Sequence, residues 1–108
     1  MSQLNDLIQQ EKTNLVAETA KIPWDELERF YAQGKIILVC SSLDLIEVAY
    51  EFSVDNTNKT KQWIDSGKLL RHFDQQAKDF VEHDTELWCV VIKPWILVQI
   101  ARSNNTDV

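Results

Sequence analysis

The longest apolar run in the chain spans residues 86–100, ELWCVVIKPWILVQI. Its β-branched and aromatic residues suit the packed surface of a sheet, and its nearly unbroken apolar character indicates strands covered on both faces. Pro94 interrupts the run and cannot donate a ladder hydrogen bond, so it indicates an edge, a bulge or a turn. We therefore predict strands at residues 87–92 and 95–100, joined by a bend or an irregular turn at Lys93-Pro94.

Apolar residues recur at helical spacing in most of the remaining chain. Three residues indicate helix boundaries: Pro23 is favoured at a helix start, Gly34 at a helix end and Asp74 at a helix N-cap. Helices are expected at about residues 2–20, 23–34, 43–53, 59–66 and 74–82. Two short apolar segments, at residues 35–40 and 68–71, predict two further strands.

The order of these elements predicts an α+β fold, in which about five helices cover a small mixed or antiparallel sheet. The strands near residues 35–40, 87–92 and 95–100 are expected to form its centre, with the helices packed on one face. We expect residues 18–102 to form a single α+β domain and residues 103–108 to form a disordered tail. Residues 1–17 are expected to be an N-terminal helical extension, either a packing helix or a dimerisation arm.

Charge narrows the classes of partner. The net charge is −6 and the pI about 4.8, which argues against nucleic acid, because neutralising phosphates needs clustered Lys and Arg. The N-terminus lacks the basic and apolar regions of a signal peptide. The apolar run is too short for a membrane-spanning helix and holds Lys93 and Pro94 near its middle. We therefore expect a soluble cytoplasmic protein that binds neither nucleic acid nor membrane.

Cys40 is the strongest candidate for chemistry. It lies where a strand is expected to end and a helix to begin, and a helix N-terminus lowers the pKa of a thiol. Such a thiol would suit a nucleophile or a redox sensor, with His72 or His83 brought near by the fold. The alternative is a small buried residue at a strand end, which is the usual setting of a free cysteine.

Metal binding has less support. His83 and Glu86 have a spacing found in helical carboxylate–histidine sites, but such sites need a second copy of the motif on another helix, and the chain has one. The strand expected to begin near Glu86 also breaks the helical geometry. We therefore expect no metal ion and no cofactor, and interpret these residues as solvated charge at a helix end.

Four tryptophans are many for 108 residues. Most are expected in the core or at its rim, although a tryptophan-lined surface would suit a peptide or a flat ligand. Trp88 and Trp95 flank the bend and would lie close together in a hairpin. The candidate binding surface is therefore Trp88, Lys93, Pro94 and Trp95.

Four segments together resemble a known family. They are ETAKIPWDEL at 18–27, SLDLIEVA at 42–49, WIDSGKL at 63–69 and ELWCVVIKPWILVQ at 86–99. They resemble a family of small bacterial proteins catalogued as domain of unknown function 2288, over about residues 18–99. The resemblance implies a bacterial, cytosolic, single-domain protein. The family carries no assigned activity, so the resemblance implies no catalytic residue.

Two functions remain open. The first is a small non-catalytic module that binds another protein or forms a homo-oligomer, through a sheet edge or the tryptophan-rich surface. The absence of a complete catalytic set favours this one. The second is a small thiol-dependent enzyme or redox sensor centred on Cys40.

Overall fold

The computed structural model describes residues 2–101, so the predicted tail at 103–108 lies outside the described residues. The described chain contains five helices and five strands, and no helix in it is long and apolar enough to cross a membrane. In chain order the elements are α1 (Ser2–Glu18), β1 (Ala20–Pro23), α2 (Trp24–Ala32), β2 (Ile36–Val39), α3 (Leu45–Ser53), α4 (Thr57–Asp65), β3 (Leu69–Leu70), α5 (Asp74–Glu82), β4 (Glu86–Ile92) and β5 (Trp95–Ile100).

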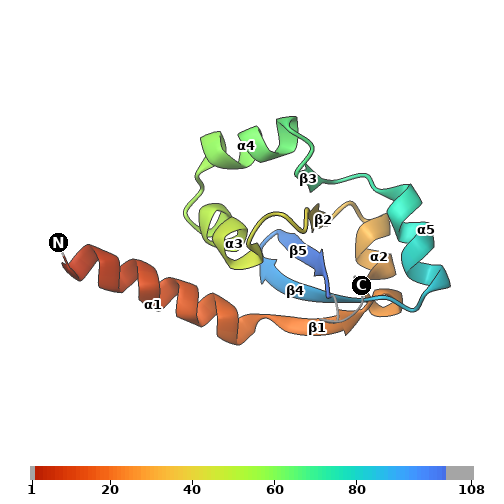
Figure 1. Ribbon diagram of the computed structural model, residues 1–108, viewed down its shortest axis with the longest axis horizontal. Helices are drawn as coiled ribbons and strands as arrows, with labels where there is room; N and C mark the ends of the chain where they lie inside the picture. Colours follow the sequence, from red (N-terminus) through yellow and green to blue (C-terminus); the bar gives the residue numbers. More distant parts are fainter. Residues whose placement is uncertain (1, 102–108) are drawn as a thin grey trace.

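The strands form one mixed sheet in the order β1-β4-β5-β2-β3 (Figure 1). Strands β4 and β5 form an antiparallel hairpin, and β5 pairs in parallel with β2. The two outer strands, β1 and β3, each pair antiparallel with their neighbour. The predicted α+β class is confirmed, and the sheet is mixed, which is one of the two predicted alternatives. As expected, the two terminal strands and β2 form its centre.

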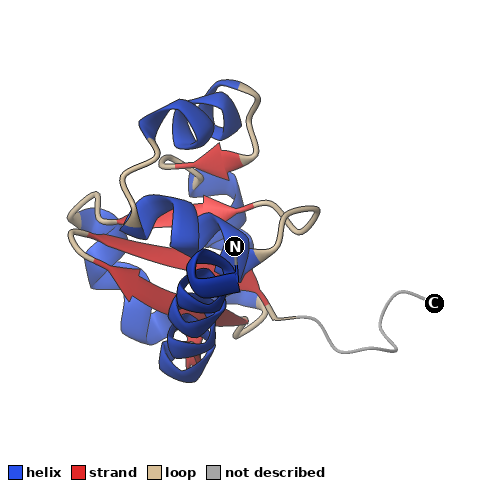
Figure 2. Ribbon diagram, turned by 90° about the vertical axis from the view of Figure 1, so that its left-hand side faces the viewer, coloured by secondary structure: helices blue, strands red, loops and turns tan. Residues whose placement is uncertain are grey.

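Helices cover both faces of the sheet (Figure 2), so the expectation that they pack on one face is wrong. Side chains alternate between the faces of a strand. Ile37 and Val39 of β2 accordingly belong to one buried cluster, with residues of α1 and α3. Ile36 and Leu38 belong to a second cluster, with residues of α2 and α5. Two cores, one on each face, hold the sheet between the helices.

Strand β1 has no counterpart in the sequence prediction. Pro23 was expected to open a helix, but it is the last residue of β1 and the N-cap of α2. Residues Ala20 to Pro23 pair with Cys89 to Glu86 of β4, and β1 is the outer strand on that side. Proline is tolerated there because the outer edge of such a strand needs no ladder donor.

Helix α1 partly packs and partly projects. Figure 1 shows its N-terminal turns leading away from the sheet and the other helices. Near its C-terminal end Leu15 is buried in the core beside α3, while Leu7 is 67% exposed. The Lys12 Nζ atom lies 2.6 Å from Oε2 of Glu47 on α3. The last turns of α1 are therefore attached to α3.

Candidate functional site

The predicted binding residues do not form one cluster. Lys93 and Pro94 lie in the turn between β4 and β5, joined by a cis peptide bond, and Trp95 follows at once. Trp95 pairs with Ile92, whereas Trp88 pairs with Gln99. Trp88 is therefore four residues, or roughly 13 Å along the strand, from Ile92, the residue that pairs with Trp95. The expectation that the two tryptophans lie close together is wrong, because the register of the hairpin separates them.

Each of these tryptophans instead has its own cationic neighbour. The Nζ atom of Lys21 on β1 lies 5.3 Å from the ring centroid of Trp88, which is 40% exposed. The guanidinium carbon of Arg71, which follows β3, lies 4.7 Å from the ring centroid of Trp95. Both distances are in the range of cation–π attraction. Trp95 therefore lies next to the Lys93-Pro94 turn, whereas Trp88 lies next to β1.

An open groove with an apolar floor lies between α2 and the sheet and has a volume of about 660 Å³. Its floor crosses three strands and is formed by Ile22 of β1, Cys89 and Val91 of β4, and Ile96 of β5. Helix α2 forms the wall. These three strands are neighbours in the sheet, so the floor of the groove is continuous backbone-paired structure.

The groove is open because the helices cover only part of β4. Leu87, Cys89 and Val91 alternate along this strand and face the α2 side of the sheet. Their exposed fractions rise from 0% at Leu87 through 8% at Cys89 to 51% at Val91. The cover supplied by α2 and α5 therefore ends midway along the strand, although the apolar sequence continues.

The wall of the groove is acidic. Asp25, Glu26 and Glu28 line it, together with Arg29, whose guanidinium carbon lies 4.8 Å from the ring centroid of Phe30. Three carboxylates and one guanidinium leave the groove negatively charged. The sequence pattern missed this surface: it indicates that β4 is covered on both faces, and nothing in it marks where the helical cover ends.

Cys40 lies in the loop after β2 and not at a helix N-terminus, because α3 begins at Leu45 and is capped by Asp44. Its Sγ atom is 3.2 Å from the Ser42 Oγ atom. Hydrogen bonds from Ser42, aided by the charge of Lys68, lower the pKa of the Cys40 thiol. A hydrogen bond to sulfur favours the thiolate, and a nearby cation does the same. The pKa of the thiol is therefore lowered by Ser42 and Lys68, and not by a helix N-terminus as predicted.

The cavity beside Cys40 has a volume of about 220 Å³ and includes Ser41, Lys68 and Gln76 in its lining. Among the described residues that line it there is no histidine, so the fold does not bring His72 or His83 to the thiol there. Cys89 lies on β4, which β5 separates from β2, and both thiols are free. Burial raises the pKa of the Cys89 thiol.

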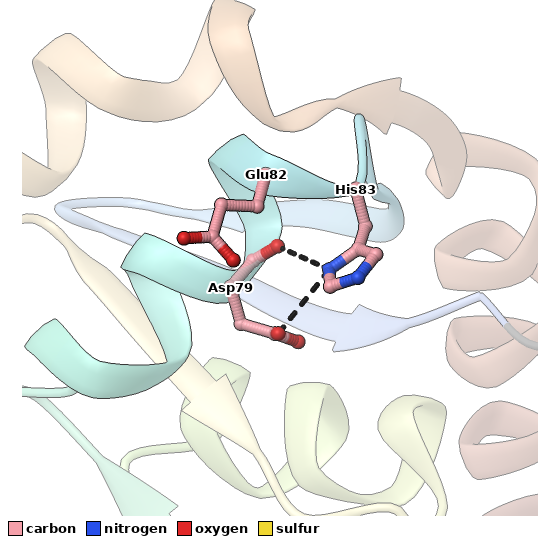
Figure 3. A group of neighbouring side chains, drawn as sticks. All are labelled: Asp79, Glu82 and His83. Carbon is pink, nitrogen blue, oxygen red and sulfur yellow. Dashed lines mark hydrogen bonds and ion pairs between the residues drawn. The ribbon is translucent and has the colours of Figure 1, made fainter.

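The two histidines lie on exposed positions. His72 follows β3, and His83 is the C-cap of α5. Figure 3 shows His83 with Asp79 and Glu82: its Nδ1 atom is 3.0 Å from the Asp79 carbonyl oxygen and 3.2 Å from Oδ1 of Asp79. The carbonyl and then the carboxylate of Asp79 raise the pKa of His83. These interactions favour the imidazolium form.

The ligand atoms of Asp79, Glu82 and His83 lie within 4.8 Å of one another, and all three residues are exposed. Glu86, which the sequence pattern pairs with His83, lies on β4 and outside this group. Structural zinc sites use four protein ligands in a closed tetrahedral arrangement. Three solvated side chains on one helix surface are ordinary for a polar helix, and they carry no argument for a metal ion.

Comparisons with known proteins give a family and a fold. Residues 10–100 match the sequence profile of the family described as "Protein of unknown function (DUF2288)". The solution NMR structure of PA1075 from Pseudomonas aeruginosa is similar, with 37% sequence identity and a TM-score of 0.75, over 93% of this chain and 90% of that chain. No curated protein matches the chain.

Proposed function

The chain belongs to the DUF2288 family of proteins of unknown function, and we propose that it is a non-catalytic interaction module. Its docking surface is the groove between α2 and the sheet. The occupant is a segment of another protein that presents apolar residues flanked by Lys or Arg. The observation that carries this proposal is the exposure of Val91. This valine lies within β4 of the five-stranded sheet and is 51% exposed.

An exposed valine on the floor of a concave surface differs from a scattered surface valine. Val91 is continuous with Ile22 and Ile96 and with the partly exposed ring of Phe30. Contiguous apolar surface with a polar rim is typical of sites that bind another protein. Burying Val91 and its neighbours removes apolar surface from water, and this transfer is the main source of affinity in such complexes.

Charge favours another protein over a second copy of this chain as the occupant of the groove. The wall carries Asp25, Glu26 and Glu28 against the single Arg29, and the whole chain has a net charge of −6. Two such molecules repel one another, whereas a basic segment is attracted and oriented by the carboxylates. A partner with apolar and basic residues therefore fits the groove better than a homo-oligomer does.

A bacterial and cytoplasmic setting accords with the proposal. Free thiols such as those of Cys40 and Cys89 remain reduced in a cytosol. The similar solved structure is that of a Pseudomonas protein.

The test uses a short amphipathic helical peptide built from leucine and lysine, with a leucine–glutamate peptide of the same pattern as its counterpart. We expect the basic peptide to shift the backbone amide NMR signals of Val91, Ile96 and Ile22, and the acidic peptide to leave them in place. Val91→Lys should weaken binding by about tenfold or more, because it removes apolar surface and adds a repulsive charge. Val54→Lys is the matched control, since Val54 is 50% exposed and lies outside the groove.

Three results would overturn the proposal. The two peptides could bind equally, which would remove the role of the acidic wall. Val91→Lys could bind the basic peptide as tightly as the unchanged protein does. Sedimentation could show a dimer that Val91→Lys dissociates, in which case the groove is a self-association surface.

A second candidate function has one observation in its favour. Ser42 and Lys68 lower the pKa of Cys40, and the thiol is partly exposed beside a cavity. This setting suits a thiol-dependent sensor, in which the thiolate is the reactive form. The described residues that line the cavity include no histidine or carboxylate to act as a general base, so we favour a sensor over an enzyme. The dependence of Cys40 alkylation on pH tests it.

A further inference from the structure

A separate cavity lies between the α3–α4 helix pair and the end of the sheet where the β4–β5 hairpin turns. Its volume is about 240 Å³. Trp95 of β5 and Ile37 of β2 line it from the sheet, and Phe52 of α3 and Ile64 of α4 line it from the helices. None of its lining residues belongs to the groove beside α2. It is smaller than the roughly 300–1,000 Å³ of pockets that hold drug-sized ligands.

The apolar lining has a rigid base. Ile37 is 1% exposed and belongs to the core between the sheet and α3, against which Phe52 and Trp95 also pack. The indole and phenyl rings are therefore anchored by the same cluster that fixes α3 on the sheet. Ile64, on the neighbouring helix, is 42% exposed. An apolar side chain of a ligand entering this cavity would meet aromatic and aliphatic surface that is already in place.

Arg71 supplies a positive charge at the cavity. Its guanidinium lies over the Trp95 ring, with 4.7 Å between the guanidinium carbon and the ring centroid. Two ion pairs occur within the described residues, at Lys12–Glu47 and His83–Asp79, and neither involves Arg71. The planar fork of N–H groups on an arginine matches a carboxylate bidentately, and contact with the indole limits the conformations that the side chain can adopt.

Carboxylates supply a negative charge at the same cavity. Glu51 of α3 and Asp55, in the turn after α3, line it together with the hydroxyl groups of Thr57 and Thr60. One oxygen of Glu51, Oε1, accepts a hydrogen bond from Nδ2 of Asn56 at 2.8 Å. Neither Glu51 nor Asp55 pairs with Arg71 within 4.0 Å. Opposite charges on different elements thus face one small cavity without neutralising one another.

We propose that this cavity binds a free amino acid with an apolar or aromatic side chain. The ligand carboxylate pairs with Arg71, its ammonium group is held by Glu51 and Asp55, and its side chain packs between Phe52 and Trp95. A zwitterion neutralises both walls at once, which an apolar molecule or a simple anion does not. The site is independent of the docking groove and gives the module a small-molecule ligand.

Three matched probes separate the contributions of the two charges. Phenylalanine carries both, 3-phenylpropanoic acid lacks the ammonium group, and 2-phenylethylamine lacks the carboxylate. Binding is followed by the NMR signal of the Trp95 indole N–H and by calorimetry. We expect phenylalanine to bind about tenfold or more tightly than either analogue, because removing one charge-assisted hydrogen bond weakens binding by about a factor of ten.

Two substitutions assign the charges to residues. Arg71→Gln should abolish measurable phenylalanine binding, while Lys59→Gln should leave it unchanged. Lys59 is a matched control because its Nζ atom lies 5.6 Å from the Trp63 ring centroid, outside the cavity. Glu51→Gln keeps an oxygen that can accept from Asn56 and should reduce the preference for phenylalanine over 3-phenylpropanoic acid.

The proposal is overturned if none of the probes shifts the Trp95 signal, or if phenylalanine and 3-phenylpropanoic acid bind equally. Equal binding would assign a simple carboxylate as the ligand. Binding that survives Arg71→Gln would also overturn it. Val91→Lys should leave phenylalanine binding unchanged, so failure of this site and failure of the docking groove are distinguishable.

Discussion

The side-chain amide of Gln99 on β5 donates a hydrogen bond to the backbone carbonyl of Cys40 at 3.0 Å. The same nitrogen donates to the carbonyl of Leu43 at 2.7 Å. One side chain in the middle of the sheet thus holds both ends of a loop segment between β2 and α3. The segment at residues 86–99, one of the four that carry the family resemblance, ends at Gln99, and these hydrogen bonds give the glutamine a structural role.

Gln99→Leu should lower the free energy of unfolding by about 1–3 kcal/mol, because two partly buried carbonyl groups lose their donor. Urea-induced unfolding measures the change. Gln75→Leu on the exposed surface of α5 is the control and should change stability by no more than about 0.5 kcal/mol. Equal stability of the two variants would mean that water replaces the Gln99 amide at no cost.

The two thiols should differ in their alkylation by iodoacetamide. Ser42 and Lys68 lower the pKa of Cys40, whereas burial raises that of Cys89. Since the thiolate reacts, Cys40 should react faster and its rate should level off at a lower pH. Peptide mass spectrometry reports both residues in one sample.

Ser42→Ala should move the Cys40 rate profile to higher pH, and Ser41→Ala should leave it in place. A profile for Cys40 that matches free cysteine would contradict an activated thiol, and the sensor function would lose its support.

The sequence predicts strands best where apolar residues alone define them. The runs expected at residues 35–40, 87–92 and 95–100 correspond to β2, β4 and β5, since runs rich in β-branched residues fit the pleated surface of a sheet better than a helix. Strand β1 is defined instead by its partner: Ala-Lys-Ile-Pro lacks a strand pattern of its own and is extended because it pairs with β4. Pairing with a distant segment leaves no local signal.

The candidate sites depend on such long-range packing even more strongly. The hairpin of Trp88 and Trp95 was predictable, but their separation follows from its register. The apolar run indicates that Val91 is a core residue, whereas its exposure depends on where α2 ends over the sheet. Arg71 and Glu51 are ordinary surface charges in the sequence, and the packing of α3 and α4 on the sheet brings them to one cavity. These relationships are tertiary, so local patterns do not contain them.

Tyr31 links α2 to α5. Its hydroxyl group donates to the Asp74 carboxylate and accepts from the backbone N–H of Phe73, with 2.9 Å between nitrogen and oxygen. Tyr31→Phe removes both hydrogen bonds and should cost about 1–3 kcal/mol of stability. Tyr50→Phe, on a ring beside Lys12 in the other half of the fold, is the control. Thermal unfolding at neutral pH compares them.

The same tyrosine makes stability depend on pH. Burial, and then the hydrogen bond to Asp74, raise the pKa of Tyr31 above its ordinary value of 10.0. The folded protein therefore favours the neutral phenol, so this contribution is complete below about pH 10 and is lost as the pH rises through the folded pKa. Stability should fall above about pH 10, and Tyr31→Phe should make that fall shallower. A fall of equal steepness in the variant would exclude Tyr31 as its cause.

Leu15 and Leu7 test where the folded domain begins. Both lie on α1, within the predicted extension at residues 1–17, but Leu15 is 3% exposed and Leu7 67% exposed. Leu15→Ala should lower the free energy of unfolding by about 2–5 kcal/mol, because it leaves a cavity between α1 and α3. Leu7→Ala should change it by no more than about 0.5 kcal/mol. Chemical denaturation measures both. If the two variants are equally stable, α1 contributes nothing to the core and the domain starts near residue 18. If they differ as expected, the domain starts within α1, in agreement with a family match that begins at residue 10.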